Sequence, residues 1–86
     1  MRQAIIGCGR VAPFHAEAIK QIPTTELVAV CDIDKTKAIN FGERYQAKPY
    51  FDFKELLRRE KPDVIDICVP SYLHPEIGHR FQGEDN

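Results

Sequence analysis

Two glycines near the amino terminus and one later carboxylate are the residues whose types and spacing could do chemistry. Residues 7–12 read Gly-Cys-Gly-Arg-Val-Ala, a G-x-G-x-x-A pattern directly after the apolar run 4–6. In such a turn Gly7 permits a tight bend, Gly9 leaves bare backbone open to an approaching group, and Ala12 lets a helix pack closely on the strand. Free N–H groups at the start of that helix attract phosphate. The pattern therefore indicates a phosphate-binding loop.

Asp32 strengthens this interpretation, because a glycine pair alone also occurs in ordinary strand-to-helix turns. It follows the second apolar run, Leu27–Cys31, and lies 23 residues after Gly9. In dinucleotide-binding folds a carboxylate near this distance hydrogen-bonds the 2′-hydroxyl of a ribose. The two features in register predict a dinucleotide site. A carboxylate there repels a 2′-phosphate, which favours NAD over NADP, and the nearby Lys35 and Arg10 weaken that preference.

The rest of the chain predicts the elements that hold these residues. Four apolar runs predict strands at residues 4–6, 27–31, 49–51 and 64–69. Three helical patterns separate them, with expected inner faces of Val11, Phe14, His15, Ala18, Ile19 and Ile22, then Ala38, Phe41, Gly42 and Tyr45, then Phe53, Leu56 and Leu57. Asp34 and Asp52 are expected to cap the second and third helices, and Pro49 confines the third strand to an edge. This alternation predicts an α/β fold, a partial Rossmann fold whose four-stranded parallel sheet has the order 3-2-1-4 with flanking helices.

The composition fits one globular unit. With 86 residues the chain holds at most one compact domain, and 43% hydrophobic with 29% charged residues argues against disorder. A net charge of −1 with scattered basic residues favours neither nucleic acid nor membrane as partner, and we expect a cytoplasmic protein without leader or membrane span. Cys8, Cys31 and Cys68 lie far apart, which favours reduced, structural thiols over a disulfide or a metal site.

Three stretches resemble one known family, the Gfo/Idh/MocA oxidoreductases, named after glucose–fructose oxidoreductase, inositol dehydrogenase and MocA. The stretch GCGRVAPFH resembles the family's opening motif, ELVAVCDIDKTKA its second strand with Asp32 as the ribose-binding acid, and DVIDICVPSYLHPEIG its fourth strand and following loop. The resemblance covers about residues 2–78. It implies the NAD(P)-binding domain of enzymes that oxidise a hydroxyl of a sugar, cyclitol or nucleotide sugar by hydride transfer.

The resemblance also implies which residues bind the cofactor, and it assigns none in this chain to catalysis or to a metal. Together with the glycine motif, the expected cofactor-binding residues are Gly7, Gly9, Arg10, Val11, Ala12, Asp32, Val69, Pro70, Ser71 and His74. Ser71 replaces the family's usual asparagine. Arg10 either contacts the pyrophosphate or is solvated, and His74 either lines the cofactor or simply starts a helix. His15 is expected to be a packed or partly exposed helical residue, and His79 receives no role.

In the family, the helix that begins near His74 leads to a further strand ending in Glu-Lys-Pro and then to a second, substrate-binding domain, and neither follows here. We therefore expect residues 1–78 to be the N-terminal part of a Rossmann domain, and 79–86 to be a non-matching polar tail from a truncated, frameshifted or cut gene. Hydride transfer needs a substrate and a proton acceptor beside the nicotinamide, so weak dinucleotide binding without turnover is expected.

An open edge on the fourth strand predicts marginal stability or self-association. Two alternative functions stand beside the oxidoreductase interpretation. One is a non-catalytic nucleotide-binding or redox-sensing module, and the other is a structural remnant that binds nothing. The sequence identifies neither substrate nor oligomeric state.

Overall fold

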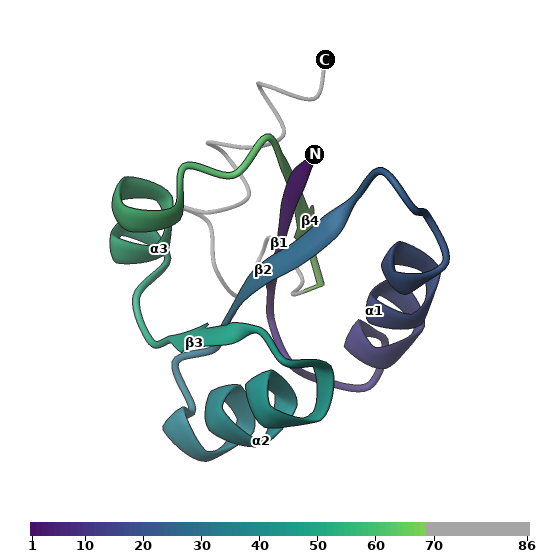
Figure 1. Ribbon diagram of the computed structural model, residues 1–86. Helices are drawn as coiled ribbons and strands as arrows, with labels where there is room; N and C mark the ends of the chain where they lie inside the picture. Colours follow the sequence, from purple (N-terminus) through teal and green to yellow (C-terminus); the bar gives the residue numbers. More distant parts are fainter. Residues whose placement is uncertain (69–86) are drawn as a thin grey trace.

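Strands and helices alternate along residues 1–68, the part of the chain that the computed structural model describes (Figure 1). In chain order the elements are β1 (Arg2–Ile6), α1 (Ala12–Lys20), β2 (Glu26–Cys31), α2 (Lys35–Tyr45), β3 (Lys48–Tyr50), α3 (Phe53–Glu60) and β4 (Val64–Ile67). The strands form one parallel sheet in the order β3-β2-β1-β4. The predicted fold class and strand order are confirmed.

Helices α1 and α2 cover one face of the sheet, and α3 covers the other. Because side chains alternate along a strand, Ile5 and Val30 pack against α1 and α2, whereas Ile6 and Ala29 lie on the α3 side. All four of these side chains are 3% exposed or less. Burial on both faces explains why β1 and β2 are continuous apolar runs in the sequence.

The ends of α2 and α3 follow the predicted capping chemistry. The Asp34 carboxylate accepts a hydrogen bond from Lys37 N at 3.3 Å, and Asp52 accepts one from Lys54 N at 2.9 Å. The predicted inner face of α2 is buried, including Gly42, where a Cβ would lie 2.6 Å from the carbonyl oxygen of Ala47. Leu56 is fully buried on α3 as predicted.

The predicted inner face of α1 is wrong at every position but one. Its buried residues are Ala12, Ala16 and Ile19, whereas Phe14 is 76% exposed. The other members of the predicted stripe, Val11, His15, Ala18 and Ile22, are also exposed. The reason is steric: alanines at i and i+4 let the helix approach the sheet closely, and large side chains at those positions would hold it away.

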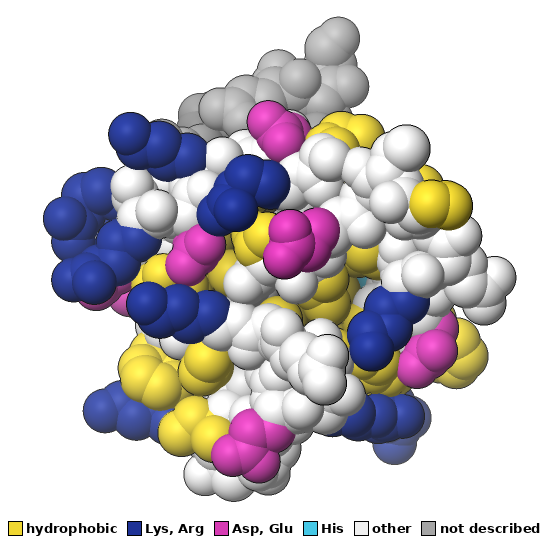
Figure 2. All heavy atoms as spheres, viewed as in Figure 1, with side chains coloured by type: hydrophobic (Ala, Val, Ile, Leu, Met, Phe, Trp, Pro, Cys, Tyr) yellow, Lys and Arg dark blue, Asp and Glu magenta, His cyan; other side chains and the backbone are white. Residues whose placement is uncertain are grey.

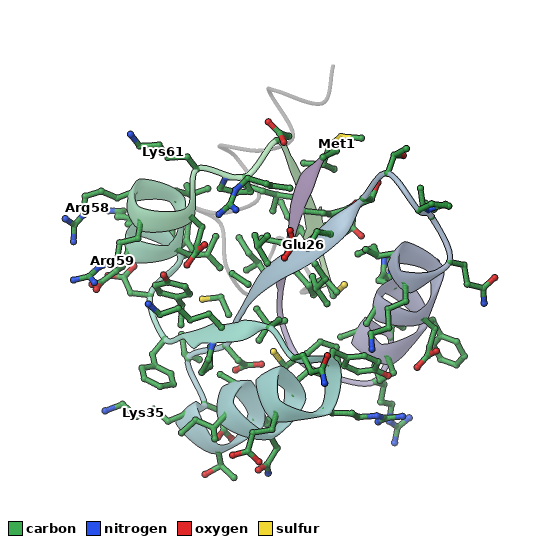
Figure 3. All side chains as sticks on the ribbon, viewed as in Figure 1. Met1, Glu26, Lys35, Arg58, Arg59 and Lys61 are labelled. Atoms are coloured by element: carbon green, nitrogen blue, oxygen red, sulfur yellow. The ribbon has the colours of Figure 1, made fainter. Side chains whose placement is uncertain are left out.

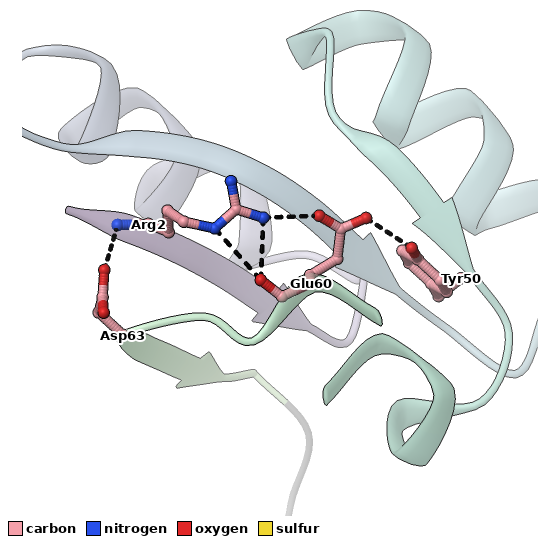
Figure 4. Close-up of polar contacts among 4 residues, drawn as sticks. All are labelled: Arg2, Tyr50, Glu60 and Asp63. Carbon is pink, nitrogen blue, oxygen red and sulfur yellow. Dashed lines mark hydrogen bonds and ion pairs between the residues drawn. The ribbon is translucent and has the colours of Figure 1, made fainter. Parts of the chain in front are cut away.

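A polar cluster fastens the end of α3 to the start of β1 (Figure 4). The Arg2 guanidinium donates to the Glu60 carbonyl oxygen and to its carboxylate, and Tyr50 Oη donates to the other carboxylate oxygen. The Asp63 carboxylate accepts a hydrogen bond from Arg2 N at 2.7 Å. These contacts lie at the amino end of β1, away from the glycine loop at its carboxyl end.

The outer surface of α3 is basic. Figure 2 shows Lys and Arg side chains gathered over this helix, and Arg58, Arg59 and Lys61 project from it in Figure 3. Both arginines pair with Glu55 of the same helix, at 4.0 Å for Arg58 and 2.9 Å for Arg59. The basic surface is therefore partly neutralised within α3. Among residues 1–68, no helix is long and apolar enough to cross a membrane.

Candidate functional site

The predicted glycine motif forms the loop between β1 and α1, at the carboxyl edge of the sheet. Gly7 has φ of 99°, in the region that side chains with a Cβ rarely adopt, so glycine is needed for the bend. Its amide donates to the Cys31 carbonyl oxygen at 2.7 Å, which ties the loop to the end of β2. In open α/β sheets, ligands bind at this edge.

Gly9 has no structural need to be glycine within residues 1–68. It is exposed, its φ is not positive, and a Cβ added to it would meet no atom within 4 Å. The bare backbone is therefore free for a group that approaches from outside the chain. A dinucleotide pyrophosphate needs such an approach, so the loop fits this cofactor.

The start of α1 leaves positive charge uncompensated beside Gly9. Val11 is the N-cap residue and makes no side-chain capping bond, Pro13 lies in the first turn, and that turn holds no acidic residue. The amide groups at a helix start and the helix dipole together favour a bound anion. Ala12, fully buried, brings this helix start close to the sheet.

Asp32 lies at the end of β2 beside the loop, as predicted. Its Oδ2 accepts a hydrogen bond from Cys8 N at 2.9 Å, and its Oδ1 accepts one from Asp34 N at 2.9 Å. The residue is partly exposed. Two oxygens offer about four acceptor positions, so the carboxylate can also accept from a ribose hydroxyl.

The basic residues that bear on a 2′-phosphate lie on two different segments. The Lys35 ammonium lies over the Phe51 ring, 5.5 Å from its centroid, and the side chain projects outward from α2 (Figure 3). Arg10 is exposed in the glycine loop. Either interpretation of Arg10, a phosphate contact or a solvated side chain, stays a prediction.

The three thiols are free, and Cys8 and Cys31 are buried beside the site. Burial, followed by the neighbouring Asp32 carboxylate, raises the pKa of both thiols from 9.0 to about 12. Burial raises the pKa of Cys68 to about 11. These groups stay protonated at neutral pH, and a protonated thiol is a poor nucleophile. No group of three metal-ligating side chains occurs in residues 1–68.

Sequence reasoning missed the partners of His15. Its Nδ1 lies 3.3 Å from Asp66 Oδ2, and the same oxygen accepts a hydrogen bond from Gln3 Nε2 at 3.0 Å. The expectation of a partly exposed helical histidine agrees with its 44% exposed side chain. Asp66 is the only polar residue in the apolar run of β4, which was the available signal.

Four of the predicted cofactor-binding residues, Val69, Pro70, Ser71 and His74, lie outside the described residues. They stay predictions. So does the boundary at residue 78 between a Rossmann part and a tail.

A parallel sheet in this order, with a glycine loop and a carboxylate at adjacent strand ends, defines the class of dinucleotide-binding Rossmann domains. The chain belongs to the GFO_IDH_MocA family, described as an oxidoreductase family with an NAD-binding Rossmann fold, whose model matches residues 1–83. The resemblance seen in the sequence is confirmed.

Known relatives agree with this assignment. D-glucoside 3-dehydrogenase of Escherichia coli is 40% identical over 78 residues, which cover 88% of this chain and 22% of that enzyme. The WlbA dehydrogenase of Chromobacterium violaceum, solved with NADH and UDP-GlcNAcA, has a TM-score of 0.80 at 34% identity over 88% of this chain and 22% of its own. A 3-ketoreductase of Actinomadura kijaniata, solved with NADP and TDP-benzene, has a TM-score of 0.81 at 30% identity over 93% of this chain and 24% of its own. The chain thus spans less than a quarter of the length of these relatives.

Proposed function

We propose that the chain binds NAD at the carboxyl edge of β1 and β2. The observation that carries this proposal is Gly9. Neither its backbone angles nor its packing in residues 1–68 requires a glycine, and it lies just before the start of α1, a helix without a side-chain cap. The pyrophosphate approaches this loop, and the ribose hydroxyls face the Asp32 carboxylate. NAD is preferred over NADP, because a 2′-phosphate would meet a fixed negative charge at Asp32.

We further propose that this site serves the oxidation of a hydroxyl of a sugar, cyclitol or nucleotide sugar in the full-length enzyme. Support comes from the family and from the relatives, one named as a glucoside dehydrogenase and another solved with a nucleotide sugar. Bound NAD supplies the hydride acceptor. This chain's own residues bind and orient it, and we propose that the 86-residue chain alone binds without turnover, because hydride transfer also needs a substrate and a proton acceptor held beside the nicotinamide.

A redox-sensing module is less well supported than a binding domain. Sensor thiols have lowered pKa values and are accessible, whereas burial raises the pKa of Cys8 and Cys31 to about 12. Free thiols do support a reducing compartment, and we propose the cytoplasm.

Titration of NAD and of NADP into the isotope-labelled chain, followed by amide NMR, tests the proposal. We expect shifts centred on residues 7–12 and 32–34, with tighter binding of NAD than of NADP. Absence of NAD-dependent shifts in these segments would refute the binding site. A turnover assay with sugars and cyclitols on the same sample tests the predicted lack of activity, and NADH formation there would contradict it.

A further inference from the structure

We infer that Asp32 holds the phosphate-binding loop in shape, in addition to its contact with the ribose. This inference rests on the proposed dinucleotide site. The Asp32 carboxylate joins two separate backbone segments, since Oδ2 accepts from Cys8 N and Oδ1 accepts from Asp34 N, each at 2.9 Å. Asp32 is thus a positioning residue for the loop as well as a ligand-binding residue.

Three hydrogen bonds attach the glycine loop to the end of β2. Gly7 N donates to the Cys31 carbonyl oxygen at 2.7 Å, and Cys8 Sγ lies 3.5 Å from that same oxygen. The bond from Cys8 N to Asp32 is the third, and it alone has a charged acceptor. Charge-assisted bonds are roughly twice as strong as neutral ones. It is also the only one of the three whose acceptor is a side chain, so substitution can remove it.

The residue held by Asp32 lies between the two glycines. Glycine gives the backbone on either side of Cys8 the widest conformational freedom, and ordering such residues is entropically costly. A fixed Cys8 amide therefore restricts the backbone conformations of the loop at Gly9 before any ligand binds, so less conformational entropy is lost on binding. The same carboxylate keeps free acceptor positions for a ribose hydroxyl, so the two roles are compatible.

This arrangement has a consequence for cofactor preference. Replacing the acid would remove the charge that repels a 2′-phosphate, which by itself favours NADP. In this chain a replacement that removes both side-chain oxygens, such as Asp32→Ala, also releases the Cys8 amide and loosens the loop that both cofactors share. We therefore expect Asp32→Ala to weaken the binding of both NAD and NADP, instead of exchanging one preference for the other.

Binding of NAD and of 2′,3′-dideoxy-NAD, an analogue without hydroxyls on the adenosine ribose, to the wild-type chain and to Asp32→Ala separates the two roles. The analogue offers Asp32 no hydroxyl on that ribose and keeps the pyrophosphate. Loss of the charge-assisted loop bond predicts that Asp32→Ala weakens 2′,3′-dideoxy-NAD binding by about five- to tenfold. An unchanged affinity for 2′,3′-dideoxy-NAD would mean that Asp32 acts on the ribose alone, and would overturn the inference.

Asp34→Asn is the matched control for the loss of charge. It removes one negative charge two residues away, and asparagine caps a helix as well as aspartate does. Asp34 accepts from Lys37 N at the start of α2 and donates only its own backbone amide to Asp32. We expect its affinity for 2′,3′-dideoxy-NAD to stay within about twofold of wild type, because exposed charges contribute little. An equal loss in both variants would overturn the inference.

Hydrogen exchange of the Cys8 amide tests the loop without any ligand. In Asp32→Ala we expect this amide to exchange faster, while the amides of Ile5 and Val30 in the sheet keep their wild-type rates. Unchanged Cys8 exchange, or faster exchange at all three amides, would contradict a local role. In the wild-type chain a scalar coupling between Cys8 N and Asp32 Cγ reports the bond directly. If NAD does not bind, the proposed function is wrong. The hydrogen-exchange experiment needs no ligand, so it still shows whether the loop depends on Asp32.

Discussion

The Arg2 guanidinium and Glu60 are joined through both the backbone and the side chain of Glu60. Arg2 Nη2 lies 2.9 Å from the Glu60 carbonyl oxygen and 2.8 Å from Oε1, and Arg2 Nε lies 3.2 Å from the same carbonyl. Glu60 Oε2 accepts a hydrogen bond from Tyr50 Oη at 2.5 Å. One carboxylate thus connects the first strand, the last described helix and the end of β3 (Figure 4).

Arg2→Ala should lower the free energy of unfolding by about 1–3 kcal/mol, the range for hydrogen bonds that involve a charged group. The loss arises because the Glu60 carbonyl, in the last turn of α3, and Oε1 of the partly buried Glu60 carboxylate lose the Arg2 guanidinium as their donor. Urea unfolding followed by circular dichroism measures it. Arg59→Ala is the control, since its pair with Glu55 is exposed and should contribute less than about 1 kcal/mol. Equal losses would mean that the cluster is no stronger than a surface ion pair.

The two loop glycines should respond differently to alanine. Gly7→Ala forces a side chain into φ of 99° and should cost about 1–3 kcal/mol of stability. Gly9→Ala should leave the unfolding free energy within about 0.5 kcal/mol, because its Cβ meets no atom of residues 1–68. Its NAD affinity should nevertheless fall at least about tenfold as the methyl blocks the pyrophosphate. Unfolding curves and NAD titration check both, and full NAD affinity in Gly9→Ala would argue against a pyrophosphate at this loop.

The two sides of α1 should differ in their contribution to stability. Ile19→Ala removes a side chain that is 3% exposed and should cost about 2–5 kcal/mol, whereas Phe14→Ala should change stability by less than about 0.5 kcal/mol. Denaturant midpoints of the two variants provide the measurement. A large loss of stability in Phe14→Ala would instead support the inner face of α1 that the sequence predicted, in which Phe14 is buried.

Much of the fold could be predicted because its causes are local. The apolar runs that became β1 and β2 are buried on both faces, and Asp34 and Asp52 cap helices with their own side chains. The face of α1 could not be predicted from hydrophobicity. Close packing on the sheet selects small residues such as Ala12 and Ala16, and the large apolar residues of the same helix are left outside.

The sequence predicted which residues make up the candidate site, but it did not predict the hydrogen bonds between them. Gly7, Gly9 and Asp32 lie together at one edge of the sheet, as their spacing indicated, because the fold brings the ends of adjacent parallel strands together. Their roles in binding a cofactor stay predictions. The bond from Cys8 N to the Asp32 carboxylate depends on the exact bend at Gly7, which no sequence pattern encodes. The same holds for the contact of His15 with Asp66, which requires α1 to lie over β4.

Alkaline pH should destabilise the fold. Burial raises the pKa of Cys8 and Cys31 from 9.0 to about 12, so the unfolded chain loses these protons before the folded chain does. The stabilisation is therefore complete below pH 9 and is lost as the pH rises towards 12. Tyr50, whose pKa burial and then Glu60 raise from 10.0 to about 12, acts in the same direction. Urea midpoints between pH 8 and 11 measure the fall, and a flat profile would contradict the buried protonated thiols.

The sheet has two different edges, and only one should self-associate. β3 has three residues including Pro49, whereas β4 has no proline and, within residues 1–68, pairs only with β1. We expect concentration-dependent association in sedimentation velocity. It should come with slower amide exchange in Val64–Ile67 at high concentration and unchanged exchange in Lys48–Tyr50. Concentration-independent sedimentation would rule out the β4 edge as a contact.

The central position of β1 determines when the loop that follows it becomes rigid. Arg2 and Asp63, 61 residues apart in the chain, exchange hydrogen bonds at 2.7 Å between the start of β1 and the turn into β4. Strand β1 therefore gains its second neighbour in the sheet, β4, only after all the residues between them have been synthesised. Closing so long a loop is slow compared with local helix formation. During synthesis the helices can form early, whereas the glycine loop becomes ordered only after nearly all of residues 1–68 have been synthesised.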